Sequence, residues 1–395
     1  MRASSRILGG NQDGMALLLT LVILSVILSV SFEINRRVRG QIKGAQGMKA
    51  QALLMDRAEA GLAIARALLI KDAIETDLDS VQEDWARETY IQTLLAELGY
   101  AEDELSLTIT DEMGKIQVNA LVSAFPGHGE NSVQRKLLED LLSLFIGADK
   151  SRDDRDPAAI VNCLVDWLDS NDNDMITGLS GAESDYYQSL TPPHDCANTS
   201  LVEVGQLFRV KGITRDLFNL PEDEEHPLNM IFDKPPAPGD IFTVCGAESG
   251  GTGVDKKDAG GYTYTYPGKI NINTAPVPVI AVLLPEGKQD LAPALAAFRE
   301  ERSDGEEGFT NDLSLKGWYA LAAGLTPRER GEMEKKIIYA SSIFRVRARA
   351  ACKGETLCLD AVYHREKNRD GKWECVCLGR RRYVGGGMSP KKGRG

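Results

Sequence analysis

The stretch Gly14-Met-Ala-Leu-Leu-Leu-Thr-Leu-Val-Ile-Leu-Ser-Val-Ile-Leu-Ser-Val-Ser-Phe32 decides how the rest of the chain is organised. The part from Met15 to Phe32 carries no charge, and as a helix it can cross a hydrocarbon core of about 30 Å. A secretory signal peptide is cleaved after its apolar core. Here the candidate processing signal lies before the core, because a short polar leader ends in Gly14. Cleavage after Gly14 would leave the apolar helix at a new N-terminus, Met15.

The helical pattern continues beyond the apolar segment. Apolar side chains recur at steps of three, four or seven residues from Ile34 to Leu69, which predicts an amphipathic helix that ends near Asp72. A helix from Met15 to Asp72 would be about 87 Å long. A solvent-exposed stalk or a coiled coil is the alternative. A helix with one half in a membrane or filament and the other half on a sheet accounts for more of the pattern.

Composition limits the classes of protein to which the chain can belong. Its 395 residues leave room for two or three domains after the helix, and the net charge of −12 disfavours a protein that coats nucleic acid. Basic residues follow the apolar segment more densely than they precede it, so charge alone favours a large domain in the cytoplasm. The segment from 381 to 395 is basic and rich in glycine, which predicts a flexible tail.

Period-two alternation predicts strands at both ends of the large domain. Leu105–Thr110 and Lys115–Asn119 flank an Asp-Glu-Met-Gly turn, which predicts a hairpin. Residues 342–350 place Phe344 and its alternate neighbours on one face and three arginines on the other. Two more strands are expected near 355–365 and 372–378. Helical patterns fill the interval between, at 133–145, 157–168, 200–210, 214–220, 288–302, 313–324 and 327–339.

An acidic run is the main candidate for a ligand site. Asp169, Asn171 and Asn173 have the alternate spacing of a Ca²⁺ loop. The run is not an EF-hand, because the sixth position is Asp174 instead of Gly and the twelfth is Ser180 instead of Glu. We expect the ligands among Asp169, Asn171, Asp172, Asp174, Glu183 and Asp185. A solvated acidic loop is the alternative.

Other chemistry has little support in the sequence. The four histidines do not accompany any nucleophile, metalloprotease, P-loop or dinucleotide motif, so we do not expect an enzyme. Seven cysteines predict some disulfides if the domain is exported. The last four, at 352, 358, 375 and 377, allow three pairings that sequence cannot rank. No CxxC pair exists, which disfavours zinc.

These motifs together resemble the K-type minor pseudopilins of type II secretion. The Gly14/Met15 junction is similar to the processing site of type IV pilins and pseudopilins. Those subunits carry Glu at the fifth mature position, and the K-type subunit is the one known to lack it; this chain has Leu19 there. Three further stretches match the family, namely Asp111–Asn119, Asp166–Tyr187 and Gly268–Pro276.

The resemblance implies an α+β fold, with a pilin-like long N-terminal helix packed on an antiparallel sheet and a large inserted all-helical domain. The expected segments are a cleaved leader (1–14), the helix (15–72), a first α/β part (73–125), the helical insert with the acidic loop (126–262), a second α/β part (263–380) and the tail (381–395).

The resemblance also implies a role. The expected protein is a non-enzymatic subunit at the tip of the pseudopilus that initiates or caps filament assembly. Its implied partners are the I- and J-type minor pseudopilins, the major pseudopilin and the prepilin peptidase, which would cleave after Gly14 and methylate Met15. The implied cofactor is Ca²⁺ in the inserted domain. The implied location is the inner membrane, single-pass, with the large domain in the periplasm; we prefer this to the location that the flanking charges favour.

Two alternatives remain. Leu207–Ile213 and Ile270–Ala275 also resemble helix-hairpin-helix modules, in which a turn presents backbone N–H groups to phosphate. A membrane-anchored DNA receptor is therefore the rival function, although acidic surroundings oppose binding to nucleic acid. The other alternative is an envelope protein with an ordinary signal anchor.

Overall fold

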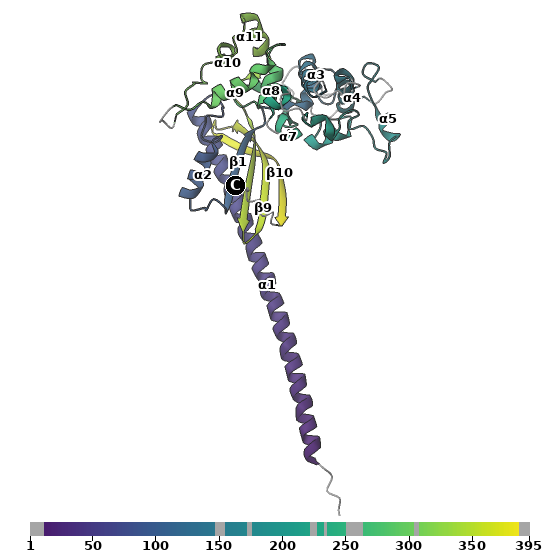
Figure 1. Cartoon of the computed structure of the whole chain (residues 1–395), viewed down its shortest axis with the longest axis vertical. Helices are drawn as coiled ribbons and strands as arrows, with labels where there is room; N and C mark the ends of the chain where they lie inside the picture. Colours follow the sequence, from purple (N-terminus) through teal and green to yellow (C-terminus); the bar gives the residue numbers. More distant parts are fainter. Residues whose placement is uncertain are drawn as a thin grey trace, which may run out of the picture.

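The computed structural model describes residues 12–146, 155–171, 176–221, 227–232, 235–249, 264–303 and 308–386. Figure 1 shows a long helix whose N-terminal half stands clear of everything else, a sheet packed on its C-terminal half, and a helical body at the far end of the sheet. The fold is α+β and pilin-like, as the sequence predicts.

Helix α1 runs without interruption over Gln12–Glu75, 64 residues, and is therefore about 96 Å long. Its side chains are exposed almost throughout up to Lys49. Beyond that point Leu54, Ala58, Leu62, Ala65 and Leu69 are buried, at steps of three or four residues. The predicted helix is confirmed, but only the C-terminal part of the predicted stripe is covered within this chain.

The main sheet has the strand order β1-β8-β9-β10, and all neighbours are antiparallel. Its strands are β1 (Leu105–Asp111), β8 (Ile343–Cys352), β9 (Glu355–Lys367) and β10 (Trp373–Gly386). The predicted alternation in β8 is confirmed: Phe344, Val346, Ala348 and Ala350 are buried in one core with α1 and with α2 (Glu88–Glu97). Helix and sheet approach closely at Gly61, where a Cβ would lie 2.9 Å from that of Ala348.

The predicted hairpin is wrong. Strand β1 pairs with β8, more than 230 residues later, in a register that places Leu105 opposite Ala350 and Ile109 opposite Val346. Strand β2 (Ile116–Gln117) instead pairs in parallel with β3 (Phe242–Thr243). Strand β1 alternates as predicted, whereas 115–119 is buried throughout and only Ile116–Gln117 of it is a strand, so β8 offers β1 a longer partner than β2 does. Local alternation does not distinguish a near partner from a distant one.

The helical body has one continuous core that extends from Ile116 to Ile337. It therefore includes the segment 263–337, which the predicted boundary at 262/263 assigns to the sheet domain. Asp156 caps its helix as predicted, accepting a hydrogen bond of 3.0 Å from the amide of Ala158. Its α-helices are α3 (Ser132–Ile146), α4 (Pro157–Leu168), α5 (Ser184–Gln188), α6 (Pro227–Ile231), α7 (Pro238–Ile241), α8 (Val277–Leu283), α9 (Ala292–Glu300), α10 (Trp318–Ala322) and α11 (Pro327–Glu334).

Shorter elements join these helices. The 3₁₀ turns are η1 (Val118–Leu121), η3 (Val204–Arg209), η4 (Arg215–Phe218) and η5 (Gln289–Leu291). The last three replace or shorten the helices expected at 200–210, 214–220 and 288–302. Two small strand pairs complete the body, β4 (Glu248–Ser249) with β5 (Tyr264–Thr265), and β6 (Ile270–Asn271) with β7 (Ile337–Ile338).

Two further expectations differ from the structure at the C-terminal end. Strand β10 continues to Gly386, so residues 381–386 belong to the sheet and not to a flexible tail. The seven cysteines are free, contrary to the expected disulfides. The strand register explains this for Cys358, which lies opposite Arg349 on one side and Tyr383 on the other. The remaining tail lies outside the described residues.

Candidate functional site

The first candidate site is the exposed half of α1. Among the described residues, one helix is long and apolar enough to cross a membrane, and its most apolar window has a mean hydropathy of 2.7 with no residue buried inside the protein. Met15 and Leu19 are 73% and 64% exposed. Such a surface is unfavourable in water, which is consistent with a single-pass membrane anchor.

The predicted processing junction lies near the start of this helix. Gly14 is helical, and a Cβ built on it would have no neighbour within 4 Å. The bond between Gly14 and Met15 is thus free of contacts with the folded part of the chain. Most of the predicted leader precedes the described residues. Cleavage and methylation at this junction remain predictions.

The second candidate site is the acidic loop after α4. Asp166, in the last turn of that helix, is fully buried and accepts hydrogen bonds from the amides of Thr177 (2.9 Å) and Ala182 (2.8 Å). These bonds fold the loop back onto the helix. Gly181 is required at the contact, because a Cβ there would lie 2.0 Å from Oδ2 of Asp166. Asp166 was not among the predicted ligands, and it holds the loop in place.

Asp169 and Asn171, two of the predicted ligands, are in contact. Asp169 is 3% exposed, and burial raises the pKa of its carboxyl group to about 6. The amide N–H of Asn171 donates to its Oδ1 at 3.2 Å. The side-chain amide oxygen of Asn171 also faces both carboxylate oxygens, and exchanging its oxygen and nitrogen would turn this contact into hydrogen bonds. The contacts favour the exchanged orientation, in which the amide nitrogen of Asn171 donates to both carboxylate oxygens of Asp169.

Two of the other predicted ligands, Glu183 and Asp185, belong to helix α5 and its N-cap. Glu183 is buried at the N-cap of α5, and Asp185 is exposed in the first turn of that helix. Within the described ranges, Asp169, Glu183 and Asp185 do not form a group whose oxygens all lie within 4.8 Å. Asp172 and Asp174 lie outside the described residues. The structure thus shows a contact between Asp169 and Asn171, and the ligand set as a whole stays a prediction.

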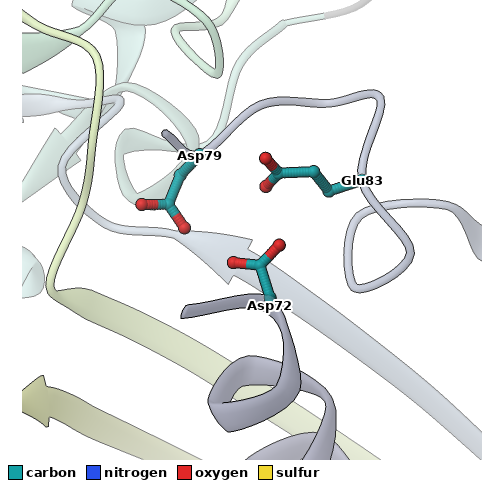
Figure 2. Close-up of side chains that lie close together, drawn as sticks. All are labelled: Asp72, Asp79 and Glu83. Atoms are coloured by element: carbon teal, nitrogen blue, oxygen red, sulfur yellow. The ribbon is translucent and has the colours of Figure 1, made fainter. Parts of the chain in front are cut away.

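A third acidic site was not predicted. Figure 2 shows Asp72 at the end of α1 with Asp79 and Glu83 from the loop that follows, their carboxylates turned towards one another. One oxygen of each lies within 4.8 Å of the others. The sequence signal was weak, because the three acids follow no spacing typical of a metal site.

Arg365 of β9 supplies the positive charge for this carboxylate cluster (Asp72, Asp79 and Glu83). Its Nη1 donates to Oδ2 of Asp72 at 2.7 Å, and its Nη2 donates to both oxygens of Asp79 at 2.6 and 2.7 Å. Burial raises the pKa of Asp79 to about 6 and also raises that of Asp72, although the guanidinium acts in the opposite direction on both. Arg365 lies on the otherwise apolar face of strand β9, and this position was the sequence signal available for the site.

Glu83 completes the cluster from its outer side. Its Oε2 accepts hydrogen bonds from the amide of Ser80 (3.0 Å) and from Nε1 of Trp85 (2.7 Å). Burial, followed by the charge of Asp72, raises the pKa of Glu83 to about 8. Glu83 therefore retains its proton at neutral pH, which leaves two carboxylates for one guanidinium. The cluster is a buried ion-pair network already provided with a cation.

The family-like stretch Gly268–Pro276 ties this network to the helical body. Nδ2 of Asn271 donates to the backbone oxygen of Asp79 (3.0 Å), to Oδ2 of Asp111 (3.1 Å) and to Oγ of Ser341 (2.9 Å). Ser341 in turn donates its amide to Asp79 at 2.7 Å. The end of α1, the sheet and the helical body therefore meet at one set of polar contacts.

The segments that suggested DNA binding are used for packing. Ile270, Asn271, Ile272 and Asn273 are fully buried, so their backbone is not presented to a phosphate. In the other segment, Leu207–Ile213, the side chain of Lys211 packs on an aromatic ring. Its Nζ lies 4.6 Å from the centroid of the Tyr186 ring.

Comparison with known proteins agrees with this architecture. Residues 114–220 match the family model described as type II secretion system (T2SS), protein K. The chain is 26% identical over 218 residues to a putative type II secretion system protein K of Escherichia coli (strain K12), and 23% identical over 211 residues to type II secretion system protein K of Aeromonas hydrophila. These matches cover 53% and 52% of this chain and span 61% of the length of each relative.

A solved structure has the same fold. A chain of the GspK-GspI-GspJ complex from the type 2 secretion system of enterotoxigenic Escherichia coli superimposes with a TM-score of 0.53 and 16% sequence identity, covering 88% of this chain and 99% of that one. The fold and the apolar helix define a pilin-like protein with a single candidate membrane anchor. Together with the sequence matches, they make the chain similar to the type II secretion system protein K family over part of its length.

Proposed function

We propose that this chain is a minor pseudopilin at the tip of a type II secretion pseudopilus, where it initiates or caps the filament. One observation carries the proposal: a pilin-like helix and sheet support a large helical body at the end remote from the anchor (Figure 1). A broad body at that end would obstruct the addition of another subunit above it.

The residue at the fifth mature position supports a terminal place. In pilin-like subunits a Glu at this position is thought to pair with the N-terminal amine of a neighbour. Leu19 has no group for such pairing and avoids the cost of about 2.5–3.5 kcal/mol for an unpaired carboxylate at the centre of a membrane helix. A subunit with no neighbour above it loses nothing by this replacement.

The proposed partners are the I- and J-type minor pseudopilins, because the solved chain of the same fold comes from a GspK-GspI-GspJ complex. The same role implies two further partners, the major pseudopilin and the prepilin peptidase. We place the anchor in the inner membrane and the large domain in the periplasm.

Co-purification of the full-length chain with its I- and J-type partners tests this proposal. After extraction from membranes, we expect one copy of this chain with each partner, and one copy per pseudopilus. Many copies along a filament would overturn the tip position. Salt-sensitive binding to duplex DNA that is lost in Lys211→Gln, with no binding to either pseudopilin, would favour the DNA receptor instead.

Calcium binding by the acidic loop is a second proposal. It is supported by the depth at which Asp169 is buried, with no lysine or arginine among the groups that shift its pKa in the described residues. A divalent cation would offset the cost of that burial. The residues that would hold it are Asp169 and Asn171, with Asp172, Asp174, Glu183 and Asp185 as the remaining predicted ligands.

A further inference from the structure

The segment of α1 that follows the apolar stretch has an unusual charge. Between positions 33 and 49 it carries five basic side chains and one acidic side chain, Glu33. Arg36 and Arg37 both pair with Glu33, at 3.0 and 2.9 Å, and they remain 73% and 75% exposed. Arg39 and Lys43 are exposed and form no ion pair within the described part of the chain. The segment therefore presents a net positive surface next to a membrane-length helix.

We propose that this basic segment, led by Arg36, Arg39 and Lys43, binds the anionic phospholipid headgroups of the leaflet on the side of the large domain. The inference rests on the proposed membrane anchor, but not on the proposed place at a filament tip. A negative lipid surface is the partner that matches the charge of the segment and its position along the helix.

Helix geometry brings the charges to the correct depth. If the hydrocarbon core ends near Phe32, Arg36 lies about 6 Å and Arg39 about 10 Å farther along the axis. The headgroup layer occupies about 5–8 Å on each side of the core. Long basic side chains can bend back towards that layer. Lys43, about 16 Å from Phe32, is within about one Debye length of the layer's outer edge.

The three cations also share one face of the helix. Successive residues of an α-helix are rotated by about 100°, which places Arg36, Arg39 and Lys43 within a sector of about 60°. Ile34 and Val38 lie on the opposite side, Ile42 lies between that side and Arg39, and all three are exposed in this chain. The segment can thus offer its basic face to lipid while its apolar face remains available to other helices.

The position of these charges is not explained by a role in membrane insertion. Basic residues usually mark the side of a membrane helix that stays in the cytoplasm. Here the dense cluster is on the side of the large domain, opposite to that rule when this domain is exported. Contact with anionic headgroups gives the cluster a favourable environment on that side.

Lipid selectivity of the full-length chain tests the inference. The chain is reconstituted in vesicles of phosphatidylcholine with phosphatidylglycerol, and the fraction of each spin-labelled lipid immobilised by the protein is measured. One basic side chain near an anionic surface strengthens association about five-fold. We expect at least that preference for phosphatidylglycerol, and its decrease with salt.

Two variants make the test specific. The triple variant Arg36→Gln, Arg39→Gln and Lys43→Gln should bind both lipids equally, because Arg37 and Glu33 then compensate each other. Lys49→Gln removes the same kind of exposed charge from the same helix, about 25 Å beyond Phe32, and should leave the preference unchanged. Equal binding of both lipids by the unmodified chain, or an equal loss in Lys49→Gln, would overturn the inference. Failure of the chain to insert would overturn both this inference and the anchor.

Discussion

The guanidinium of Arg365 and the carboxylate of Asp79 form a buried two-point contact at 2.6 and 2.7 Å. The two side chains come from strand β9 and from the loop after α1, and they are 6% and 1% exposed. The same guanidinium holds Asp72 of α1. One arginine thus fixes the end of the long helix against the sheet.

Replacement of Arg365 should be costly. Arg365→Met leaves Asp72 and Asp79 buried without their cation, and we expect a loss of about 3–5 kcal/mol in the free energy of unfolding. Arg365→Lys keeps the charge but not the fork geometry, and should have an intermediate effect. The measurement is chemical unfolding of the detergent-extracted chain. The control is Arg347→Met, which removes a 61% exposed partner of Asp360 and should cost less than about 1 kcal/mol. Equal losses in the two methionine variants would contradict this account.

Stability should decrease as the pH rises towards 8. The pKa of Glu83 is raised from 4.5 to about 8, so the folded state binds this proton more tightly than the unfolded state does. The contribution of the Glu83 carboxyl group to the free energy of unfolding is complete below about pH 4.5. It is lost as the pH rises through 8, at no more than about 1.4 kcal/mol per pH unit. The raised pKa values of Asp79 and Asp111, both about 6, act in the same direction at lower pH. Glu83→Gln should flatten the slope between pH 6 and 8. An unchanged slope in that variant would place the titrating group elsewhere.

Calcium should stabilise the chain through its acidic loop. At 100 times its dissociation constant, Ca²⁺ bound only to the folded state adds about 2.7 kcal/mol. Thermal unfolding with Ca²⁺ and with a chelator measures this difference. Asp169→Asn should reduce it, whereas Asp195→Asn, an exposed aspartate of the same body, should not. Identical melting temperatures under both conditions would indicate an acidic loop without a metal.

Processing should occur between Gly14 and Met15. Mass spectrometry of the membrane-extracted protein should find an N-methylated Met15 at the N-terminus. Gly14→Val should block cleavage by crowding the peptidase site. Gly40→Val, also on an open part of α1, should be processed normally. An intact Met1 in the unmodified protein, or cleavage after Phe32, would be incompatible with a prepilin-type leader.

A carboxylate at position 19 should not improve function. Leu19→Glu places an unpaired acid in the membrane part of α1, at a cost of about 2.5–3.5 kcal/mol. We expect secretion to be unchanged or reduced, and partner binding to persist because the sheet and helical body are unaffected. Counting subunits per filament gives the independent readout. Increased secretion in this variant would argue that Leu19 does not mark a terminal subunit.

Local and periodic features of the fold were predictable from the sequence. The long helix follows from the apolar stretch and the stripe up to Leu69, and the face of β8 follows from strict alternation over 342–350. The partner of β1 was not predictable, because alternation fixes which side chains share a face and leaves the neighbouring strand undetermined. The boundary at 262/263 stays a prediction, because described helices on both sides of it contribute to one core.

The candidate sites also differ in whether the sequence could predict them. Asp169 and Asn171 could be proposed as ligands because they are close in sequence and have the spacing of a loop that binds a cation, and their role stays a prediction. The carboxylate cluster was not found, because Arg365 lies almost 290 residues from the acids that it contacts. The one local sign was a charged residue in a strand position where Leu359, Ala361 and Tyr363 are buried.

The unbroken course of α1 has a mechanical consequence. Its 64 residues form a single rod, one end of which is proposed to lie in the bilayer while the other is fastened by Asp72 to a network shared with the sheet and the helical body. A rod without a hinge, fixed at its far end, acts as a piston. A displacement of the anchor along the helix axis would therefore be passed to the helical body through the network at Asp72.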